Sequence, residues 1–334
     1  MPQTTPTWIY RTRPTGPITG ETFSLEDTPL PEPAEGEVEV ATRYLSLDAT
    51  NRVWLTEGAL YTDNVQIGGP MRGVLLGEVT KSRHPQFPEG THLSGIGPWA
   101  ARFVTDGKGF APFPLPKGAD MAEAFAILSV AGPTAHLGLL KIGGLQAGEV
   151  VSISGAAGSV GIMAGQIARA HGAHPIGIAG TDEKCAALVD HYGYAAAINY
   201  KTEDVAKALR AHAPKGIDLH FENVGGPVLD AALANMKDFA RLTICGLISA
   251  YNATDPVPGP YRFGEIVNRR LTIRGFIILD HLADFPAITQ DLARWMADGT
   301  LRMPTHVVDG LDKAPEALNL LFEGANTGKL LVRL

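Results

Sequence analysis

The chain has 334 residues, a length that predicts two domains, and its 45% hydrophobic and 19% charged residues are typical of an α/β protein. The formal net charge of −7 argues against a nucleic-acid or anionic-membrane partner, which requires a basic face. Two cysteines, Cys185 and Cys245, are too few for a four-cysteine zinc site or a disulfide framework. The N-terminus lacks the apolar core of a signal peptide, and no apolar run approaches the length of a membrane span. We therefore expect a soluble, cytoplasmic protein.

The first 125 residues predict a β-rich domain. Residues 37–47 alternate apolar and polar positions, as a half-buried strand does. Prolines and glycines interrupt residues 67–116 every few positions, which suits the short strands of a small barrel-like domain. A helical segment over 121–140 follows, and we expect an interruption at Gly132-Pro133.

From residue 149 onward, short apolar strands alternate with helices. We expect strands at 150–154, 175–179, 196–199, 217–221, 242–245 and 271–279, and helices at 160–171, 182–191, 203–212, 228–236 and 283–297. This alternation is the pattern of a doubly wound parallel sheet. The tail from residue 305 is too short for a domain and ends in a predicted strand at 329–334. We expect it to fold back onto the first domain, which makes the second domain an insertion.

A glycine-rich loop, Gly155–Gly161 (GAAGSVG), connects the first of these strands to its helix. Glycines permit a tight turn and let backbone N–H groups approach a pyrophosphate at the positive end of the helix. The spacing GxxGxxG differs from the more familiar GxGxxG, and a purely structural turn is the alternative. The flanking strand and helix supply the context that a dinucleotide site requires.

The residues after the second strand favour NADPH as the cofactor. That strand ends in IAGT at 178–181, without the acidic residue that accepts the ribose hydroxyl in an NAD site. Lys184, in the first turn of the next helix, and Tyr200, after the third strand, can both donate to a 2′-phosphate. Asp182 and Glu183 keep NAD open, and a solvated helix position is the alternative for Lys184.

At this point the chain resembles the zinc-independent medium-chain dehydrogenase/reductases, in the branch of prostaglandin reductase and bacterial curcumin reductase. The resemblance runs nearly end to end and rests on several blocks in the same order. The blocks are 44–48 (YLSLD) with Arg52, 71–73 (MRG), 82–85 (SRHP), 155–161, 180–185 (GTDEKC), 199–202 (NYKT), 221–226 (FENVGG), 245–252 (CGLISAYN) and 324–329 (GANTGK).

This resemblance implies a GroES-like β-rich catalytic domain at 1–125 and 303–334 and a Rossmann NADPH-binding domain at 126–302, with the cofactor between them. It also implies a homodimer that pairs the strand at 271–279, which fits the risk of an exposed edge strand. The cofactor-binding residues that it implies are Ala157, Gly158, Ser159, Val160, Gly180, Lys184, Tyr200, Asn223, Gly246, Ile248, Ser249, Phe276, Ile277, Ile278, Asn326 and Gly328.

The family reaction is reduction of the carbon–carbon double bond of an α,β-unsaturated ketone or aldehyde, without a metal. Hydride goes from the nicotinamide to the β-carbon, so the negative charge that builds on the carbonyl oxygen needs a donor placed in advance. A proton must then reach the α-carbon from a side chain or water. Tyr251 is the candidate catalytic donor, and packing on the cofactor or closing a loop is the alternative for its phenol.

The substrate half departs from the family at positions where close relatives carry tyrosine. The chain has DATNR at 48–52 in place of DPYMR, His136 in place of the tyrosine of TAY, and Asn268 in place of another tyrosine. The candidate substrate-pocket residues are Asn51, Tyr61, His136 and Asn268, although a lone histidine more often has a structural role.

Other oxidoreductase and hydrolase classes lack their signatures. No tyrosine has a lysine four residues later, as a short-chain dehydrogenase requires, and the glycine loop does not supply G-x-S-x-G. The cysteines and histidines show no zinc-ligand pattern. An NADPH:quinone reductase on the same fold and a non-catalytic NADPH-binding protein stay open beside the enone reductase.

Overall fold

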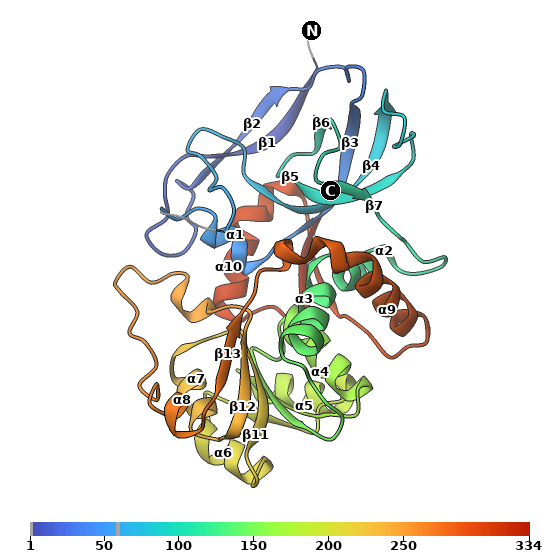
Figure 1. The fold of residues 1–334 in the computed structure, drawn as a ribbon. Coiled ribbons are helices and arrows are strands. Elements are labelled where there is room, and N and C mark those ends of the chain that lie inside the picture. Colours follow the sequence, from blue (N-terminus) through green and yellow to red (C-terminus); the bar gives the residue numbers. More distant parts are fainter. Residues whose placement is uncertain (1–2, 58–60) are drawn as a thin grey trace. The chain divides into compact units, whose positions relative to one another are not determined.

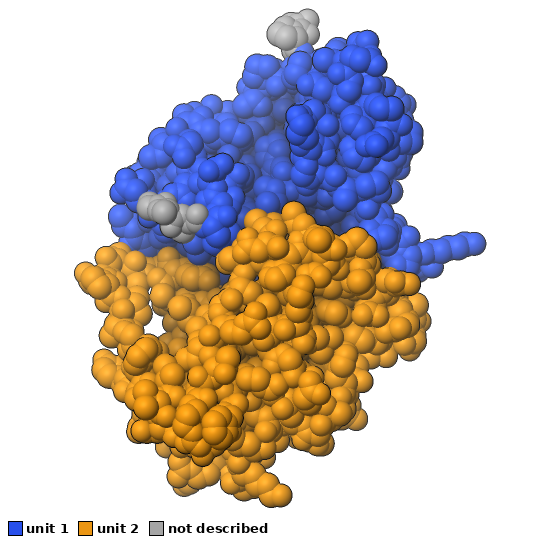
Figure 2. Space-filling model, in the orientation of Figure 1, with its two compact units in different colours: residues 1–125, 305–334 blue, residues 126–304 orange. Residues whose placement is uncertain are grey.

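A computed structural model describes residues 3–57 and 61–334 of the chain (Figure 1). The chain forms two compact units, residues 1–125 with 305–334 (unit 1) and residues 126–304 (unit 2) (Figure 2). Unit 2 is therefore inserted between two segments of unit 1, as the sequence predicts. The predicted class, a two-domain α/β fold, is confirmed.

Unit 1 is built on a seven-stranded sheet with the order β14-β15-β3-β4-β5-β7, in which β6 also pairs with β3. A separate antiparallel pair, β1 and β2, completes its strands. The strands are β1 Thr4–Tyr10, β2 Phe23–Pro29, β3 Val38–Ser46, β4 Arg72–Ser82, β5 His92–Pro98, β6 Arg102–Thr105, β7 Phe110–Pro112, β14 Thr305–Asp309 and β15 Lys329–Arg333. Its helices are α1 Ala49–Val53, the short 3₁₀ helix Leu311–Lys313 and α10 Ala314–Glu323.

The C-terminal tail completes this sheet, since β15 pairs with β14 in parallel and with β3 antiparallel. The strand expected at 37–47 forms as β3, but most of its residues are buried on both faces instead of one. The reason is tertiary: β4, β6 and β15 all pair with β3, and its apolar residues join the core around Met71 and Trp99.

Unit 2 contains a six-stranded sheet, all parallel, with the order β10-β9-β8-β11-β12-β13. This is the order of a Rossmann fold, 3-2-1-4-5-6. The strands are β8 Val150–Ser154, β9 His174–Ala179, β10 Ala196–Asn199, β11 Ile217–Glu222, β12 Met236–Ile244 and β13 Thr272–Gly275. The helices are α4 Ser159–Ala170, α5 Asp182–Tyr192, α6 Val205–His212, α7 Gly226–Leu233, α8 Glu265–Asn268 and α9 Phe285–Ala297, with 3₁₀ turns η3 at Ile248–Ala250 and η4 at Ile278–Asp284.

The largest boundary errors in unit 2 lie around Met236 and after Gly275. Met236, predicted as the end of a helix, begins β12 and pairs with Ile217, so α7 ends at Leu233. The strand predicted at 271–279 covers only Thr272–Gly275, because the chain then leaves the sheet and turns into η4. Periodicity cannot separate a short buried strand from other apolar segments, and both errors fall on such runs.

The helical segment predicted at 121–140 runs without a break from Met121 to Ile142. It begins as α2 (Met121–Ala126), continues through α3 (Gly132–His136), and has wider π turns at Ile127–Ala131 and Leu137–Ile142. The expected interruption at Gly132-Pro133 is wrong, since wider turns accommodate a proline that cannot donate a backbone bond. The segment has 22 residues and is long and apolar enough to cross a membrane, which corrects the expectation that no apolar run approaches that length. However, 72% of its most apolar window is buried in the fold, as in a core helix.

Candidate functional site

The loop between β8 and α4 has the geometry of a phosphate site. Gly155 adopts φ +59°, which favours glycine. A Cβ on Gly161 would lie 2.4 Å from the carbonyl oxygen of Gly155, so only glycine lets the helix start pack this closely on the loop. Gly158 is the N-cap of the 12-residue α4, so no capping side chain covers the first-turn N–H groups there. The positive end of a helix in this setting attracts a phosphate group.

The loop also lies where a doubly wound sheet binds ligands. β8 is a central strand with β9 on one side and β11 on the other, and the chain order reverses at this point. Ligands of such sheets bind at the carboxyl ends of the strands beside that reversal. Ala157, Gly158, Ser159 and Val160 all belong to this loop or the first turn of α4.

The predicted 2′-phosphate residues come together at the ends of β9 and β10. A Cβ on Gly180 would lie 3.1 Å from the phenol oxygen of Tyr200, so the tyrosine ring lies over Gly180. The N-cap Thr181 accepts from the backbone N–H of Lys184 at 3.2 Å, which fixes the first turn of α5. Burial lowers the pKa of Lys184, and the positive charge of Lys201 lowers it further. Two cations and a phenol therefore surround this corner, and an anion there would relieve the repulsion between the cations.

One of the two carboxylates that keep NAD open is already engaged. Asp182 Oδ1 accepts from the side-chain amide of Asn199 at 2.6 Å, which ties α5 to the end of β10. An NAD site needs a carboxylate directed at the ribose hydroxyls. The residues at this corner thus fit the 2′-phosphate of NADPH better than the ribose of NAD.

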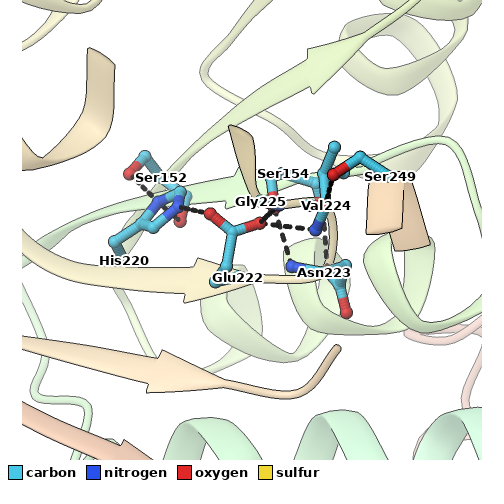
Figure 3. Close-up of polar contacts among 8 residues, drawn as sticks. All are labelled: Ser152, Ser154, His220, Glu222, Asn223, Val224, Gly225 and Ser249. Atoms are coloured by element: carbon cyan, nitrogen blue, oxygen red, sulfur yellow. Dashed lines mark hydrogen bonds and ion pairs between the residues drawn. The ribbon is translucent and has the colours of Figure 1, made fainter. Parts of the chain in front are cut away.

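Three predicted nicotinamide-side residues are joined by hydrogen bonds after β11 and β12. The backbone N–H of Asn223 donates to Ser154 Oγ, and its side-chain amide donates to the Ser154 carbonyl, each at 2.7 Å. Ile248 N–H donates to the Asn223 carbonyl. Ser249 donates to the Val224 carbonyl through both its N–H and its hydroxyl (Figure 3). The turn after β11 therefore holds the segment at 245–249.

Tyr251 follows η3, and its ring folds back over the same segment. Its phenol oxygen accepts from the N–H of Leu247 at 3.1 Å, and a Cβ on Gly246 would lie 3.1 Å from that oxygen. The phenol therefore closes a loop, as the alternative interpretation expected. A phenol can accept one hydrogen bond through its oxygen and donate another through its O–H, so the role of enolate donor stays a prediction.

Phe276, Ile277 and Ile278 follow the end of β13. The ring of Phe276 packs against Gly138, where an added Cβ would lie 2.8 Å from the tip of the ring. Phe276 is half-buried at this edge. Ile278 opens η4.

Four of the predicted residues belong to unit 1 and are described within it. Asn326 is buried and donates to the Gly328 carbonyl at 3.1 Å, directly before β15, where Gly328 adopts φ +69°. Asn51 is buried in α1, with its oxygen accepting from the Asp48 N–H at 2.8 Å and its amide donating to the Arg72 carbonyl at 3.3 Å. These bonds favour a structural role for Asn51.

Tyr61 is 45% exposed, which leaves much of its ring accessible to a ligand. Its phenol oxygen is hydrogen-bonded to the Thr50 hydroxyl and accepts from the Trp54 indole at 3.3 Å. Among the predicted pocket residues of unit 1, Tyr61 is thus the one with accessible surface.

His136 and Asn268 lie in unit 2. The His136 ring contacts two residues of α9, with Nε2 3.3 Å from Asp291 Oδ2 and the ring centroid 5.9 Å from that of Trp295. Burial lowers the pKa of His136, and Asp291 opposes this shift. Asn268 ends α8, before the start of β13, and so lies at the amino edge of a parallel sheet whose glycine loop is at the carboxyl edge. Neither placement favours a substrate role.

A buried polar network behind the glycine loop was not predicted. Ser152, Ser154, His220 and Glu222 all have a relative exposure of 0% and are hydrogen-bonded to one another (Figure 3). A signal was available: two adjacent apolar strands, VVSIS and IDLHFE, each carry polar residues at alternate positions on one face.

Neither a metal site nor a reactive thiol is indicated by the side chains that the structure describes. Within residues 3–57 and 61–334, no three His, Cys, Asp or Glu side chains gather as a metal site would require. Burial, together with the charge of Glu222, raises the pKa of the Cys245 thiol to about 12. A thiol with so high a pKa stays protonated at neutral pH, whereas the thiolate is the form that attacks as a nucleophile or binds a metal.

The two-domain fold and the phosphate site define an oxidoreductase of the dinucleotide-binding type. Residues 6–113 match the model for the N-terminal domain of oxidoreductase, and residues 159–296 match the model for zinc-binding dehydrogenase. The chain is 33% identical over 336 residues to the NADPH-dependent curcumin reductase of Escherichia coli (strain K12), covering 98% of this chain and 96% of that protein. It is 35% identical over 332 residues to prostaglandin reductase 1 of Rattus norvegicus, covering 98% of each.

The crystal structure of CurA from Vibrio vulnificus in complex with NADPH matches with a TM-score of 0.92 and 35% identity over 98% of each chain. The chain belongs to the medium-chain dehydrogenase/reductase family, in the branch of curcumin reductase and prostaglandin reductase. The resemblance seen in the sequence is thereby confirmed. The expected cofactor, NADPH, is the one named for the Escherichia coli relative and for the Vibrio vulnificus complex.

Proposed function

We propose that this chain is an NADPH-dependent reductase of the carbon–carbon double bond of α,β-unsaturated ketones or aldehydes. The observation that carries the cofactor half is the corner formed by Lys184, Lys201 and Tyr200, beside an Asp182 carboxylate that Asn199 already engages. The reaction class is supported by the full-length similarity to a curcumin reductase and a prostaglandin reductase.

When bound, NADPH supplies the hydride. The chain's own residues would hold the cofactor at its pyrophosphate through the glycine loop, at its 2′-phosphate through Lys184 and Tyr200, and at its nicotinamide. In this proposal the nicotinamide contacts come from residues of both units. Those of unit 2 are Asn223, Gly246, Ile248, Ser249, Phe276, Ile277 and Ile278, and those of unit 1 are Asn326 and Gly328.

Tyr251 is proposed as the donor to the carbonyl oxygen of the substrate. Negative charge develops on that oxygen as the β-carbon gains hydride, so a donor already in place lowers the barrier. The Leu247 N–H bond to the Tyr251 oxygen holds the phenol in one position and polarises its O–H toward donation. Among the pocket candidates, the exposed Tyr61 is the first choice for contact with substrate.

We also propose roles for the two domains and a homodimer. Residues 1–125 with 303–334 would act as the GroES-like catalytic domain, and residues 126–302 as the NADPH-binding domain. A homodimer would form by pairing β13, which ends the six-stranded sheet and so presents an unpaired edge in the described chain. Sedimentation of the purified chain would distinguish dimer from monomer.

The test of the reaction is NADPH consumption with an enone, with a quinone and without acceptor. Consumption with the enone and formation of the saturated ketone are expected. Consumption with the quinone alone would instead indicate a quinone reductase, and tight NADPH binding without turnover on either acceptor would indicate a non-catalytic binding protein.

A further inference from the structure

The buried network behind the glycine loop follows directly from strand register. β11 pairs with β8 so that His220 lies beside Ser152 and Phe221 beside Ile153. Alternation then places His220 and Glu222 on the same face as Ser152 and Ser154. Phe221 points the other way, since its ring lies within 2.6 Å of a Cβ built on Gly138. Four polar side chains are thus brought together in the interior at the carboxyl end of two central strands.

Glu222 is the hub of this network. Its Oε1 accepts from the Ser154 hydroxyl and from the backbone N–H groups of Val224, at 2.5 Å, and Gly225, at 2.9 Å. Its Oε2 lies 2.9 Å from His220 Nε2. The two N–H groups belong to the turn after β11, where Gly225 adopts φ +85°. One side chain therefore determines the shape of that turn.

The same turn carries the next segment of the site. The Glu222 carbonyl accepts from the N–H groups of Cys245, at 2.9 Å, and Gly246, at 3.2 Å. The Asn223 and Val224 carbonyls accept from the segment that contains η3, as described above. Through Ser154 the network also reaches the first residue before the glycine loop. The Glu222 carboxylate thus fixes the turn at 223–225 and contacts the residue before the glycine loop, and the same turn holds the segment at 245–249.

We propose that His220 and Glu222 form a buried positioning pair that fixes the nicotinamide side of the NADPH site. This inference rests on the proposed function and adds two positioning residues to it. Neither side chain touches the cofactor, since both are fully buried, and both act through Asn223, Val224 and Gly225.

His220 has a defined part in this pair. A carboxylate oxygen only accepts, so His220 Nε2 carries a proton that it donates to Glu222. Its Nδ1 lies 2.7 Å from the Ser152 hydroxyl and 3.1 Å from the Ser152 carbonyl, which fix the ring plane. Burial by itself raises the pKa of Glu222, but the bonds and charge of His220 and the bond from Ser154 hold it below its ordinary value. The carboxylate is thus ionised at neutral pH and accepts strongly from both backbone N–H groups.

The sheet order separates this pair from the 2′-phosphate corner. Glu222 is the last residue of β11, on one side of β8, whereas Lys184 and Tyr200 follow β9 and β10 on the other side. A change at Glu222 should therefore disturb the nicotinamide half of the site and spare the adenosine half. A change that only weakens the whole domain would disturb both halves.

The experiment compares binding of NADPH with binding of adenosine 2′,5′-bisphosphate, which carries the 2′-phosphate but no nicotinamide. Glu222→Gln keeps the size of the side chain and removes its charge. It should weaken NADPH roughly tenfold, a loss of about 1.4 kcal/mol, and change the affinity for the bisphosphate less than twofold. A displacement of about 1 Å at a reacting centre costs up to about 100-fold in rate. The kcat for the enone should therefore fall with the NADPH affinity.

Two further variants keep the proposal testable if Glu222→Gln folds poorly. His220→Leu should show the same selective loss of NADPH affinity, and His220→Gln should restore most of it, because an amide N–H can replace the Nε2–H. Glu149→Gln is the matched control. It removes a half-buried carboxylate that forms an ion pair with Arg241 directly before β8, at the end of the strand opposite the glycine loop, and should leave the affinities for both ligands unchanged.

The outcomes separate the two claims. Equal loss of both ligands in Glu222→Gln and His220→Leu, or wild-type binding of both, overturns the positioning pair while the proposed function stands. A wild-type chain that binds neither NADPH nor the bisphosphate overturns the proposed function, and the positioning pair with it.

Discussion

Replacing Lys184 by alanine tests the cofactor assignment at the residue that carries it. A charge-assisted hydrogen bond is worth about 1.5–3 kcal/mol, and about 1.4 kcal/mol corresponds to a tenfold change in affinity. Lys184 is half-buried, so solvent screens part of its charge, and Lys201 and Tyr200 remain beside it. We therefore take the lower end of the range and expect Lys184→Ala to weaken NADPH about tenfold.

The comparison with NADH makes this test specific, because the two cofactors differ only in the 2′-phosphate. Fluorescence titration of both cofactors should show NADH affinity unchanged in Lys184→Ala, and the NADPH difference should shrink at high salt. Lys207→Ala, at an exposed position of α6, is the control and should change neither affinity. Equal weakening of NADPH and NADH would refute the assignment of Lys184.

The same site predicts how cofactor preference depends on pH. The second pKa of a phosphate monoester is about 6, so the preference for NADPH over NADH should rise as pH increases through that value. Burial and the charge of Lys201 lower the pKa of Lys184, and only its protonated form attracts the phosphate. The preference should therefore fall again as pH rises through this lowered pKa. A preference that stays flat at alkaline pH in the wild type, as it should in Lys184→Ala, would contradict the argument.

Two other substitutions test the donor and the glycine loop. Tyr251→Phe should lower kcat for an enone about 100-fold with little change in NADPH affinity, since it removes the proposed donor; undiminished turnover at saturating substrate would reduce the phenol to loop packing. Gly161→Ala should lower the Tm by roughly 2–10 °C, because its Cβ would overlap the Gly155 carbonyl oxygen and overpacking costs about 1–3 kcal/mol. Gly259→Ala, with nothing within 4 Å of the added Cβ, is the control and should melt as the wild type does.

Periodicity predicted most of unit 2 because its strands and helices have strong and separate patterns. The strands at 150–154 and 196–199 form with the predicted limits, and the glycine loop falls between β8 and α4. The fold-back of the tail was also predictable, since KLLVRL cannot form a core alone. The predicted strand limits were wrong where burial depends on packing against neighbouring strands, as at Met236 and after Gly275.

The site was predicted unevenly for a physical reason. Lys184 and Tyr200 follow strand ends, and the carboxyl ends of parallel strands meet at one edge, so sequence position alone brings them together. His220 and Glu222 lie within a strand, where alternating polar residues normally predict a solvent-exposed face. The helices that cover both faces of a doubly wound sheet turn this alternation into a buried network, but periodicity alone does not show which polar side chains meet there.

The central claim is hydride delivery from NADPH to the β-carbon of an enone, and isotope labelling tests it most directly. The chain would be incubated with an α,β-unsaturated ketone and NADPH that carries deuterium at the transferred position of nicotinamide C4, and the product examined by NMR and mass spectrometry. We predict a saturated ketone with one deuterium on the β-carbon. Deuterium on the carbinol carbon of an allylic alcohol, or NADPH bound without any labelled product, would contradict the claim.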